Sequence, residues 1–221
     1  IDGGFKEEYV AIEKENLKNR IESIINDKGR YAVERAREEM FKNEKYGISD
    51  LGYLADIDKI TAKGLYEHYV NIMKTSPIDI VVEGNFDEDE IVEIISNGFD
   101  FHRENIIEIP RADFIKKVDE IKVIKEEMDI TQGKLVMGYR CNVDYKDEFK
   151  YYSLFVGSNV LGGGPHSKLF VNVREKESLC YYIYSSLEKY KTSMFISSGI
   201  ESENYDKTVE LIGEQLKSLK E

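Results

Sequence analysis

Arg174 and Tyr181 are the side chains of this sequence whose chemistry points most directly beyond folding. They stand seven positions apart near the end of the stretch NVLGGGPHSKLFVNVREKESLCYY, residues 159–182. A guanidinium and a phenol both donate hydrogen bonds, so a turn that brought them together would let them hold a peptide carbonyl or the oxyanion that develops from it. Spacing alone favours the structural alternative, a surface arginine and a core strand tyrosine.

The segment GGGPHSK, residues 162–168, raises the possibility of a phosphate loop. Such a loop needs GxxxxGK[ST] between a strand and a helix, so that backbone N–H groups surround the phosphates. Here the glycines follow a predicted helix, no glycine immediately precedes Lys168, and Pro165 removes a donor. We therefore favour a tight turn between two helices, in which glycine permits left-handed backbone conformations.

The three histidines give little support for a catalytic or metal site. His166 would act as a general base only with a carboxylate and a nucleophile nearby, so we favour a helix-start or surface residue. His68 in LYEHYV and His102 in DFHREN have no second histidine at a spacing that would present both to one ion. The sequence therefore predicts no metal site within this chain.

The two cysteines, Cys141 and Cys180, lie in apolar, tyrosine-containing surroundings without a CxxC partner. We expect two buried free thiols rather than a disulfide, and hence a cytoplasmic protein. The net charge of −12 opposes nucleic-acid binding, and no apolar run is long enough to span a membrane. The chain begins at Ile1 and ends at Glu221 within an amphipathic pattern, so we expect it to be a fragment of a longer protein.

The region before residue 100 is predicted to be mainly helical. Apolar periodicity indicates helices over residues 5–27 and 30–44, with a break at NDKG between them. Thr61 is a candidate N-cap of a further helix, and the acidic run DEDEIVEII begins another. The β-branched run PIDIVVEG, residues 77–84, predicts a strand.

The region after residue 117 alternates strands and helices. We expect strands over residues 118–127, 131–141, 180–188 and 192–200, and helices over residues 147–161, 166–175 and 203–220. Residues 100–117 between the two regions are polar and irregular, as is typical of a linker. The predicted organisation is therefore residues 1–100, a linker over residues 101–117, and residues 118–221, with the two regions able to pack as one domain.

The stretch LGGGPHSKLFVNVREKESLCYYIYSS resembles the insulinase/pitrilysin family of zinc peptidases, the inverted-HxxEH group, in the half of their peptidase unit that does not bind zinc. That pattern is a small-residue turn, Ser-x-Leu-Phe, Arg-Glu-Lys, Leu-x-Tyr and a strand hairpin. This chain supplies it with Gly162–Gly164, Ser167, Leu169, Phe170, Arg174, Glu175, Lys176, Leu179 and Tyr181. The earlier stretches EKENLKNRIESIINDKGRYA and IDIVVEGNFDEDEI resemble the end of the family's first half, so the resemblance covers nearly the entire chain.

The resemblance implies two similar α/β halves around a closed chamber. In such enzymes the first half supplies HxxEH, whose two histidines bind zinc and whose glutamate activates a water, while a more distant glutamate is the third ligand. The second half supplies an arginine and a tyrosine that reach the substrate. By this resemblance Arg174 and Tyr181 are that pair, with Tyr182 as the substitute if the register shifts by one.

The departures from the family pattern concern zinc. No HxxEH occurs in this sequence, although the motif would lie upstream of Ile1. The distant glutamate should fall within EKENLKNRIE, where the family pattern places Arg20 at the ligand position and an alignment with one gap places Glu22. Because a cation would oppose zinc, we expect the zinc-less branch of the family, acting beside an active paralogue, and no cofactor in this chain.

The expected fold is α+β, a largely antiparallel sheet with helices packed on one face. If the two halves are alike, this chain holds the last part of one half and the first part of the next. It would then form a circularly permuted single half-domain, in which the strand at residues 77–84 joins the sheet. A swapped dimer is the alternative arrangement.

Three functional interpretations follow. The first is the non-catalytic, substrate-facing portion of a peptidase homologue, inactive alone, which binds peptide or unfolded polypeptide partly by strand addition. The second is a scaffold subunit that pairs with an active peptidase paralogue. The third is a phosphate-binding module at residues 162–168. We expect neither nucleic acid nor membrane as a partner.

Overall fold

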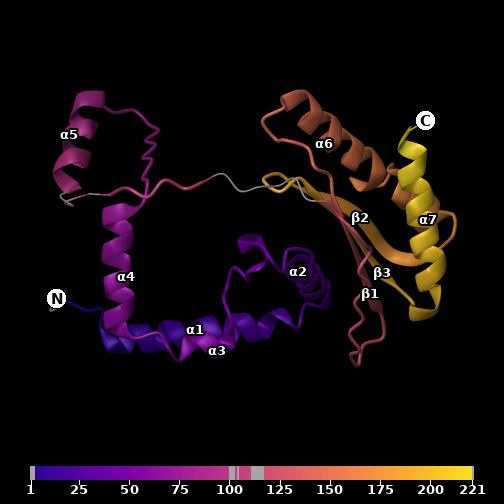
Figure 1. The fold of residues 1–221 in the computed structure, drawn as a ribbon, viewed down its shortest axis with the longest axis horizontal. Coiled ribbons are helices and arrows are strands. Elements are labelled where there is room, and N and C mark those ends of the chain that lie inside the picture. The colour runs from indigo at the N-terminus through magenta and orange to yellow at the C-terminus, as the bar shows by residue number, and fades with distance from the viewer. Residues whose placement is uncertain (1–2, 100–102, 104, 111–116, 221) are drawn as a thin grey trace. The chain divides into compact units, whose positions relative to one another are not determined.

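A computed structural model of the chain describes residues 3–99, 103, 105–110 and 117–220 (Figure 1). The chain divides into two compact units. The helical unit comprises Ile1–Asn19 and Tyr53–Arg111, and the sheet unit comprises Arg20–Gly52 and Ala112–Glu221. Much of the predicted linker, at residues 101, 102, 104 and 111–116, lies outside the described residues. The boundaries expected at residues 100 and 118 stay a prediction.

The helical unit contains most of α1 (Glu7–Ile24), the short α3 (Leu54–Ile57), α4 (Ala62–Thr75) and α5 (Glu88–Gly98). Thr61 caps α4 as predicted, because its Oγ1 accepts a hydrogen bond from the Gly64 N–H at 3.1 Å. The ring of Phe5 packs at 5.4 Å from that of Tyr66 on α4. Lys14 Nζ donates to the carbonyl of Ile60 at 2.9 Å, which joins α1 to the start of α4.

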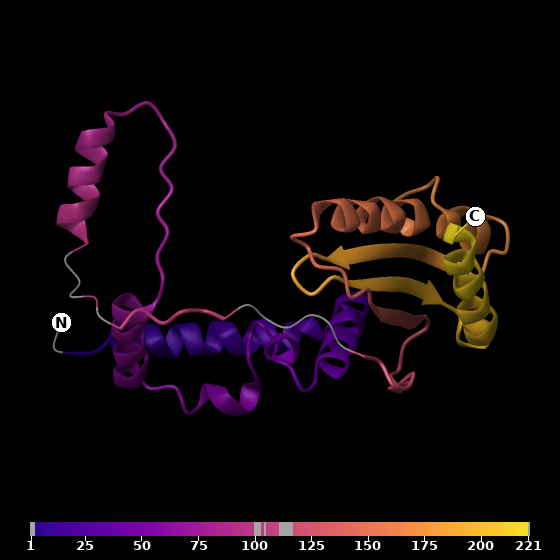
Figure 2. The same ribbon diagram turned by 45° about the horizontal axis from the view of Figure 1, so that its top comes forward.

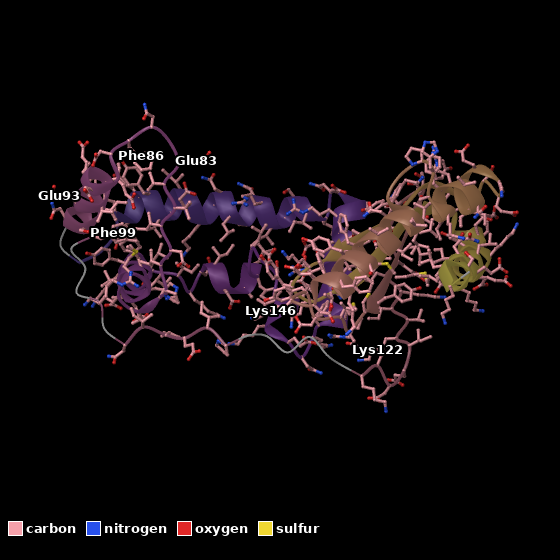
Figure 3. The ribbon with its side chains drawn as sticks, turned by 90° about the horizontal axis from the view of Figure 1, so that it is seen from above. Glu83, Phe86, Glu93, Phe99, Lys122 and Lys146 are labelled. Atoms are coloured by element: carbon pink, nitrogen blue, oxygen red, sulfur yellow. The ribbon has the colours of Figure 1, made fainter. Side chains whose placement is uncertain are left out.

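Two segments predicted as strands have no regular secondary structure. Residues 77–84 belong to the helical unit and pair with no strand of the described residues, so the prediction that they join the sheet is wrong. Residues 118–127 also form no strand; Lys122, labelled in Figure 3, lies in this segment. Both segments are rich in β-branched residues, but a strand forms only where another strand supplies hydrogen-bond partners.

The sheet unit is built on three antiparallel strands in the order β1-β3-β2. These are β1 (Gly133–Arg140), β2 (Cys180–Glu188) and β3 (Ser193–Ile200), close to the segments predicted from the sequence. A tight turn with a positive φ of 42° at Thr192 joins β2 to β3. The predicted α+β class with an antiparallel sheet is confirmed.

One face of the sheet carries the main hydrophobic core. Over it lie α6 (Glu148–Gly162), the π-helix η2 (Phe170–Glu175) and α7 (Tyr205–Lys217) (Figure 2). Single turns of 3₁₀ helix occur at η1 (Lys45–Gly47), η3 (Ser202–Asn204) and η4 (Ser218–Lys220). The residues buried in this core are Leu161, Leu169, Val173, Leu179, Cys180, Ile183, Met194, Ile196, Ile200 and Ile212. Their burial fixes the elements that carry Arg174 and Tyr181.

Helix α2 (Lys28–Met40) lies against the opposite face of the sheet (Figure 2). The sulfur of Met40 approaches Gly138 of β1 so closely that a Cβ there would lie 2.7 Å away. The prediction of helices on one face therefore describes α6 and α7, and α2 adds a layer on the other face. Asp27 begins this helix by accepting a hydrogen bond from the Arg30 N–H at 3.0 Å.

A nearly buried ionic cluster fastens the end of α2 to the sheet. Glu44 accepts hydrogen bonds from Arg140 of β1 and, at 2.8 Å, from Lys191 beside β3. The guanidinium of Arg140 also lies 4.4 Å from the ring centroid of Phe41, which is fully buried. Burial alone would raise the pKa of Glu44, but the hydrogen bonds from Lys191 and Arg140 outweigh it and the pKa is lowered.

No helix in the described parts of the chain is both long and apolar enough to cross a membrane.

Candidate functional site

The π-helix η2 positions Arg174. Val173 of this helix and Leu169, the residue just before it, are fully buried and anchor it to the core. Arg174 follows Val173, so its side chain lies at the surface of the core, with the guanidinium 4.5 Å from the ring centroid of Phe170. One guanidinium nitrogen is 3.5 Å from the Glu175 carboxylate, an exposed and therefore weak ion pair. π-Helical turns are uncommon and recur at functional sites.

A tight turn leads from η2 into β2. Ser178 has a positive φ of 55°, and its N–H donates to the carbonyl of Arg174 at 3.0 Å. The next N–H, of Leu179, donates to the carbonyl of Val173 at 3.3 Å. These two bonds satisfy carbonyls at the end of the helix and start β2 one residue later.

A β-bulge at the start of β2 separates Tyr181 from its neighbours. Cys180 pairs with Ile200 and Tyr182 pairs with Gly199, so Tyr181 is an extra residue between two paired ones. Cys180 remains in the core, whereas Tyr181 is 59% exposed. Bulges change the direction in which a side chain points. This one places the Tyr181 side chain in solvent, contrary to the alternative of a core tyrosine.

The hydroxyl of Tyr181 donates a hydrogen bond to the carboxylate of Glu201. Glu201 directly follows β3, whose last residue, Ile200, pairs with Cys180. The hydrogen bond to Glu201 raises the pKa of Tyr181, because a negative neighbour disfavours the phenolate. Tyr181 therefore keeps its proton at neutral pH and acts as a donor.

Tyr182 has a different environment. Its ring lies over Gly199 so closely that a Cβ there would be 2.6 Å from it, and it stacks on Tyr184 at 6.0 Å. Tyr182 and Tyr184 also line a shallow groove whose other wall, at the start of α2, includes Asp27. Burial is the main cause that raises the pKa of Tyr182, and the nearby Tyr184 and Asp27 raise it further. The two adjacent tyrosines thus have different partners.

Arg174 and Tyr181 both flank the entrance to β2 but contact different residues. Arg174 interacts with Phe170 and Glu175, and Tyr181 interacts with Glu201. Burial raises the pKa of the Cys180 thiol, and the hydrogen bond to Ser198 and the positive charge of Arg174 partly offset it.

Residues 162–168 form the predicted turn between two helices. Their glycines have no positive φ, so the left-handed backbone that we expected is absent from this turn. Gly162 is required for space, because a Cβ there would lie 2.5 Å from the backbone nitrogen of Ser185 on β2. The turn follows the C-terminal end of α6, where the helix dipole disfavours an anion. His166 lies exposed in the turn.

The resemblance assigns the distant zinc ligand to Arg20 or, with one gap, to Glu22. Arg20 and Glu22 are exposed residues of α1, and a guanidinium at the ligand position opposes a cation. Within the described ranges no three His, Cys, Asp or Glu side chains gather to hold an ion. His68 is exposed on α4, and His102 lies outside the described residues.

Glu201, the acceptor of the Tyr181 hydroxyl, is the site residue that sequence reasoning missed. In a regular hairpin that contains the pair Glu188–Ser193, Cys180 would lie opposite Glu201. The bulge shifts the pairing by one residue, so that Cys180 lies opposite Ile200 instead. A hairpin count could therefore have brought Glu201 near the start of β2, but not to Tyr181. Both cysteines are free thiols, as predicted; Cys180 is buried and Cys141 partly buried.

Comparison with known protein families identifies the family of this chain. The family described as Peptidase M16 inactive domain matches residues 59–221. The chain belongs to this family, on its inactive branch. A protein of Bacillus subtilis named "Probable inactive metalloprotease YmfF" is 39% identical over 216 residues, which cover 98% of this chain and 50% of that protein. An uncharacterized zinc protease of Streptomyces coelicolor, SCO5738, is 23% identical over 88% of this chain and 42% of its own length.

Solved structures show the same fold. A conserved protein from Enterococcus faecalis superposes with a TM-score of 0.85 at 32% identity, over 98% of this chain and 51% of that chain. A peptidase M16 inactive domain from Pseudomonas fluorescens gives a TM-score of 0.69 at 18% identity, over 97% and 52% of the two chains. The chain thus spans about half the length of the relatives that it matches.

Proposed function

We propose that this chain is the substrate-facing, non-catalytic portion of an M16-type protein, and that Arg174 and Tyr181 donate hydrogen bonds to a bound peptide. The observation that carries the proposal is the bulge at the start of β2, which places the Tyr181 hydroxyl in solvent beside the segment that holds Arg174. Arg174 has N–H groups that can donate to a peptide carbonyl, and the Tyr181 hydroxyl can do so once it turns away from Glu201. By itself the chain would have no peptidase activity.

The sheet offers a second element for peptide binding. In the described sheet β2 is an edge strand, with β3 on one side only. An extended peptide could add to such an edge through its backbone, and side-chain donors at the end of the strand would then fix its position. We propose Tyr181 rather than Tyr182 for this role, because Tyr182 is packed against Gly199 and Tyr184.

A second candidate function is a scaffold that pairs with an active peptidase paralogue without touching substrate. The zinc-less family branch and the arginine at position 20 favour a protein that does not perform metal chemistry itself. The free, largely buried thiols of Cys141 and Cys180 support a reducing, cytoplasmic location for either function.

The experiment is to measure peptide turnover by the full-length protein assembled with its active partner. Tyr181→Phe removes only the hydroxyl, and Arg174→Gln removes the charge. We expect each to lower turnover about 10- to 100-fold, as for loss of a hydrogen bond to a charged or polarised group. Tyr190→Phe, a change at a tyrosine exposed elsewhere, is the matched control. Unchanged turnover in all three variants would support the scaffold function instead.

A further inference from the structure

Helix α6 exposes a large apolar surface on the side away from the sheet. Its inner side is buried against β2, where Ser158 Oγ lies 3.2 Å from Ser185 Oγ. Its outer face consists of Phe149, Tyr152, Val156 and Val160, which share one side of the helix and are all exposed, Phe149 to 83%. Clustered apolar residues of this size on a helix commonly mark an interaction surface.

Two polar residues near this face donate hydrogen bonds back to the helix backbone. Ser153 Oγ donates to the carbonyl of Phe149 at 2.7 Å, and Asn159 Nδ2 donates to that of Phe155 at 2.8 Å. Each bond uses one donor of the side chain, and the remaining polar atoms of these two exposed residues can still bind water. A partner on this face would therefore cover mainly the apolar side chains, with fewer polar groups to dehydrate than if these donors were also free.

Gly157 adds an independent observation. It lies within α6, where glycine is less favourable than alanine, and apart from the adjacent residues and the helix's own backbone no described atom lies within 4 Å of the position that a Cβ would take. Nothing in this unit requires a glycine there. A shallow groove at this point is lined by Glu148, Phe149, Tyr152, Ser153, Val156 and Gly157. A glycine in such a groove permits close approach of another backbone.

We propose that the outer face of α6 is the docking surface for a helix supplied by the part of the polypeptide that this chain does not cover. This chain spans 50% of the Bacillus subtilis relative and 51% of the Enterococcus faecalis structure, so a comparable length of chain is available to cover it. A groove along a helix with a glycine at its floor accepts the ridge of a second helix. A second copy of the chain is a poorer occupant, because each carries a net charge of −12.

The first test measures access to the groove in two proteins: the 221-residue chain and a polypeptide of the length of its relatives. Val156→Cys is labelled with a maleimide and followed by mass spectrometry of the labelled peptide. Lys146→Cys, in the turn before α6 and labelled in Figure 3, is the control outside the apolar face. We expect labelling of the Val156→Cys protein to slow at least about tenfold in the longer polypeptide, and that of the control to change less than about twofold.

The second test uses Gly157→Leu. In the 221-residue chain we expect this variant to fold and to melt at or above the wild-type temperature, because leucine is the better helix former. In the longer polypeptide it should restore fast labelling at Val156→Cys, because the side chain fills the groove. This opposite response of the two proteins separates docking from a general effect on folding.

Three outcomes would overturn the proposal. Equal labelling rates in the two proteins would show that the face stays exposed. If labelling of the 221-residue chain became slower as the protein concentration rose, and light scattering gave a doubled mass, the face would be assigned to a second copy. Protection that occurs only after an unstructured peptide is added would make the face a substrate surface.

Discussion

The helical unit and the sheet unit differ in what their β-branched residues do. In the sheet unit Ile196 and Ile200 are almost completely buried between antiparallel strands and helices. In the helical unit residues 78–82 have no regular secondary structure and are exposed, with Val81 at 91%. Similar residues therefore give a paired strand in one unit and an unpaired segment in the other. Strand propensity becomes structure only where a partner strand and a covering helix are present.

The largest expected effect tests this contrast directly. Ile196→Ala removes a fully buried side chain from the central strand and should destabilise the sheet unit by about 2–5 kcal/mol. Val81→Ala, the matched change in the exposed segment, should alter stability by less than about 0.5 kcal/mol. Urea denaturation combined with hydrogen exchange of the β3 amides measures both. Similar losses for the two variants would mean that residues 77–84 are packed in solution.

The next effect concerns the ionic attachment of α2. Glu44→Gln leaves Arg140 and Lys191 without their carboxylate and should cost about 2–3 kcal/mol, below the range for a fully buried pair because Glu44 is partly exposed. Glu203→Gln, at an exposed position, is the control. The loss should appear as faster hydrogen exchange in α2. Unchanged exchange would show that apolar contacts alone hold this helix.

The same cluster gives a pH dependence with a defined sign. The pKa of Glu44 is lowered from its ordinary value of 4.5, so its contribution to stability is present above about pH 4.5 and is lost as the pH falls through the lowered pKa. Below about pH 4.5 the melting temperature of the wild type should therefore fall more steeply with decreasing pH than that of the Glu44→Gln variant. Parallel declines would contradict an ionised Glu44.

The smallest effect concerns the turn at residues 162–168. Gly162→Ala places a Cβ 2.5 Å from the Ser185 backbone nitrogen and should cost about 1–3 kcal/mol. At Gly164 there is open space, so Gly164→Ala should be nearly neutral. Thermal melting of the two variants separates a need for space from a need for backbone freedom. If Gly164→Ala were the more damaging, the conformation of the turn would matter more than the close approach.

Local patterns in the sequence predicted much of the sheet unit. The β2–β3 hairpin, the helices on one face and the Thr61 cap all follow from contacts between nearby residues, which periodicity and capping rules describe. Residues 77–84 and 118–127 were predicted wrongly because their pairing depends on distant segments. The same reason explains why α2 on the second sheet face went unnoticed, since only tertiary packing decides which surface an amphipathic helix covers.

The sequence by itself determined the family pattern, the α+β class and the donors Arg174 and Tyr181 as candidates. Only the tertiary structure decided how the adjacent tyrosines differ. The bulge at Tyr181 exposes its hydroxyl beside Glu201, while Tyr182 packs against Gly199. The physical reason is that one extra residue in a strand reverses the face of every side chain beyond it. Such a change of register depends on how two strands pair, which the residues of one strand do not specify.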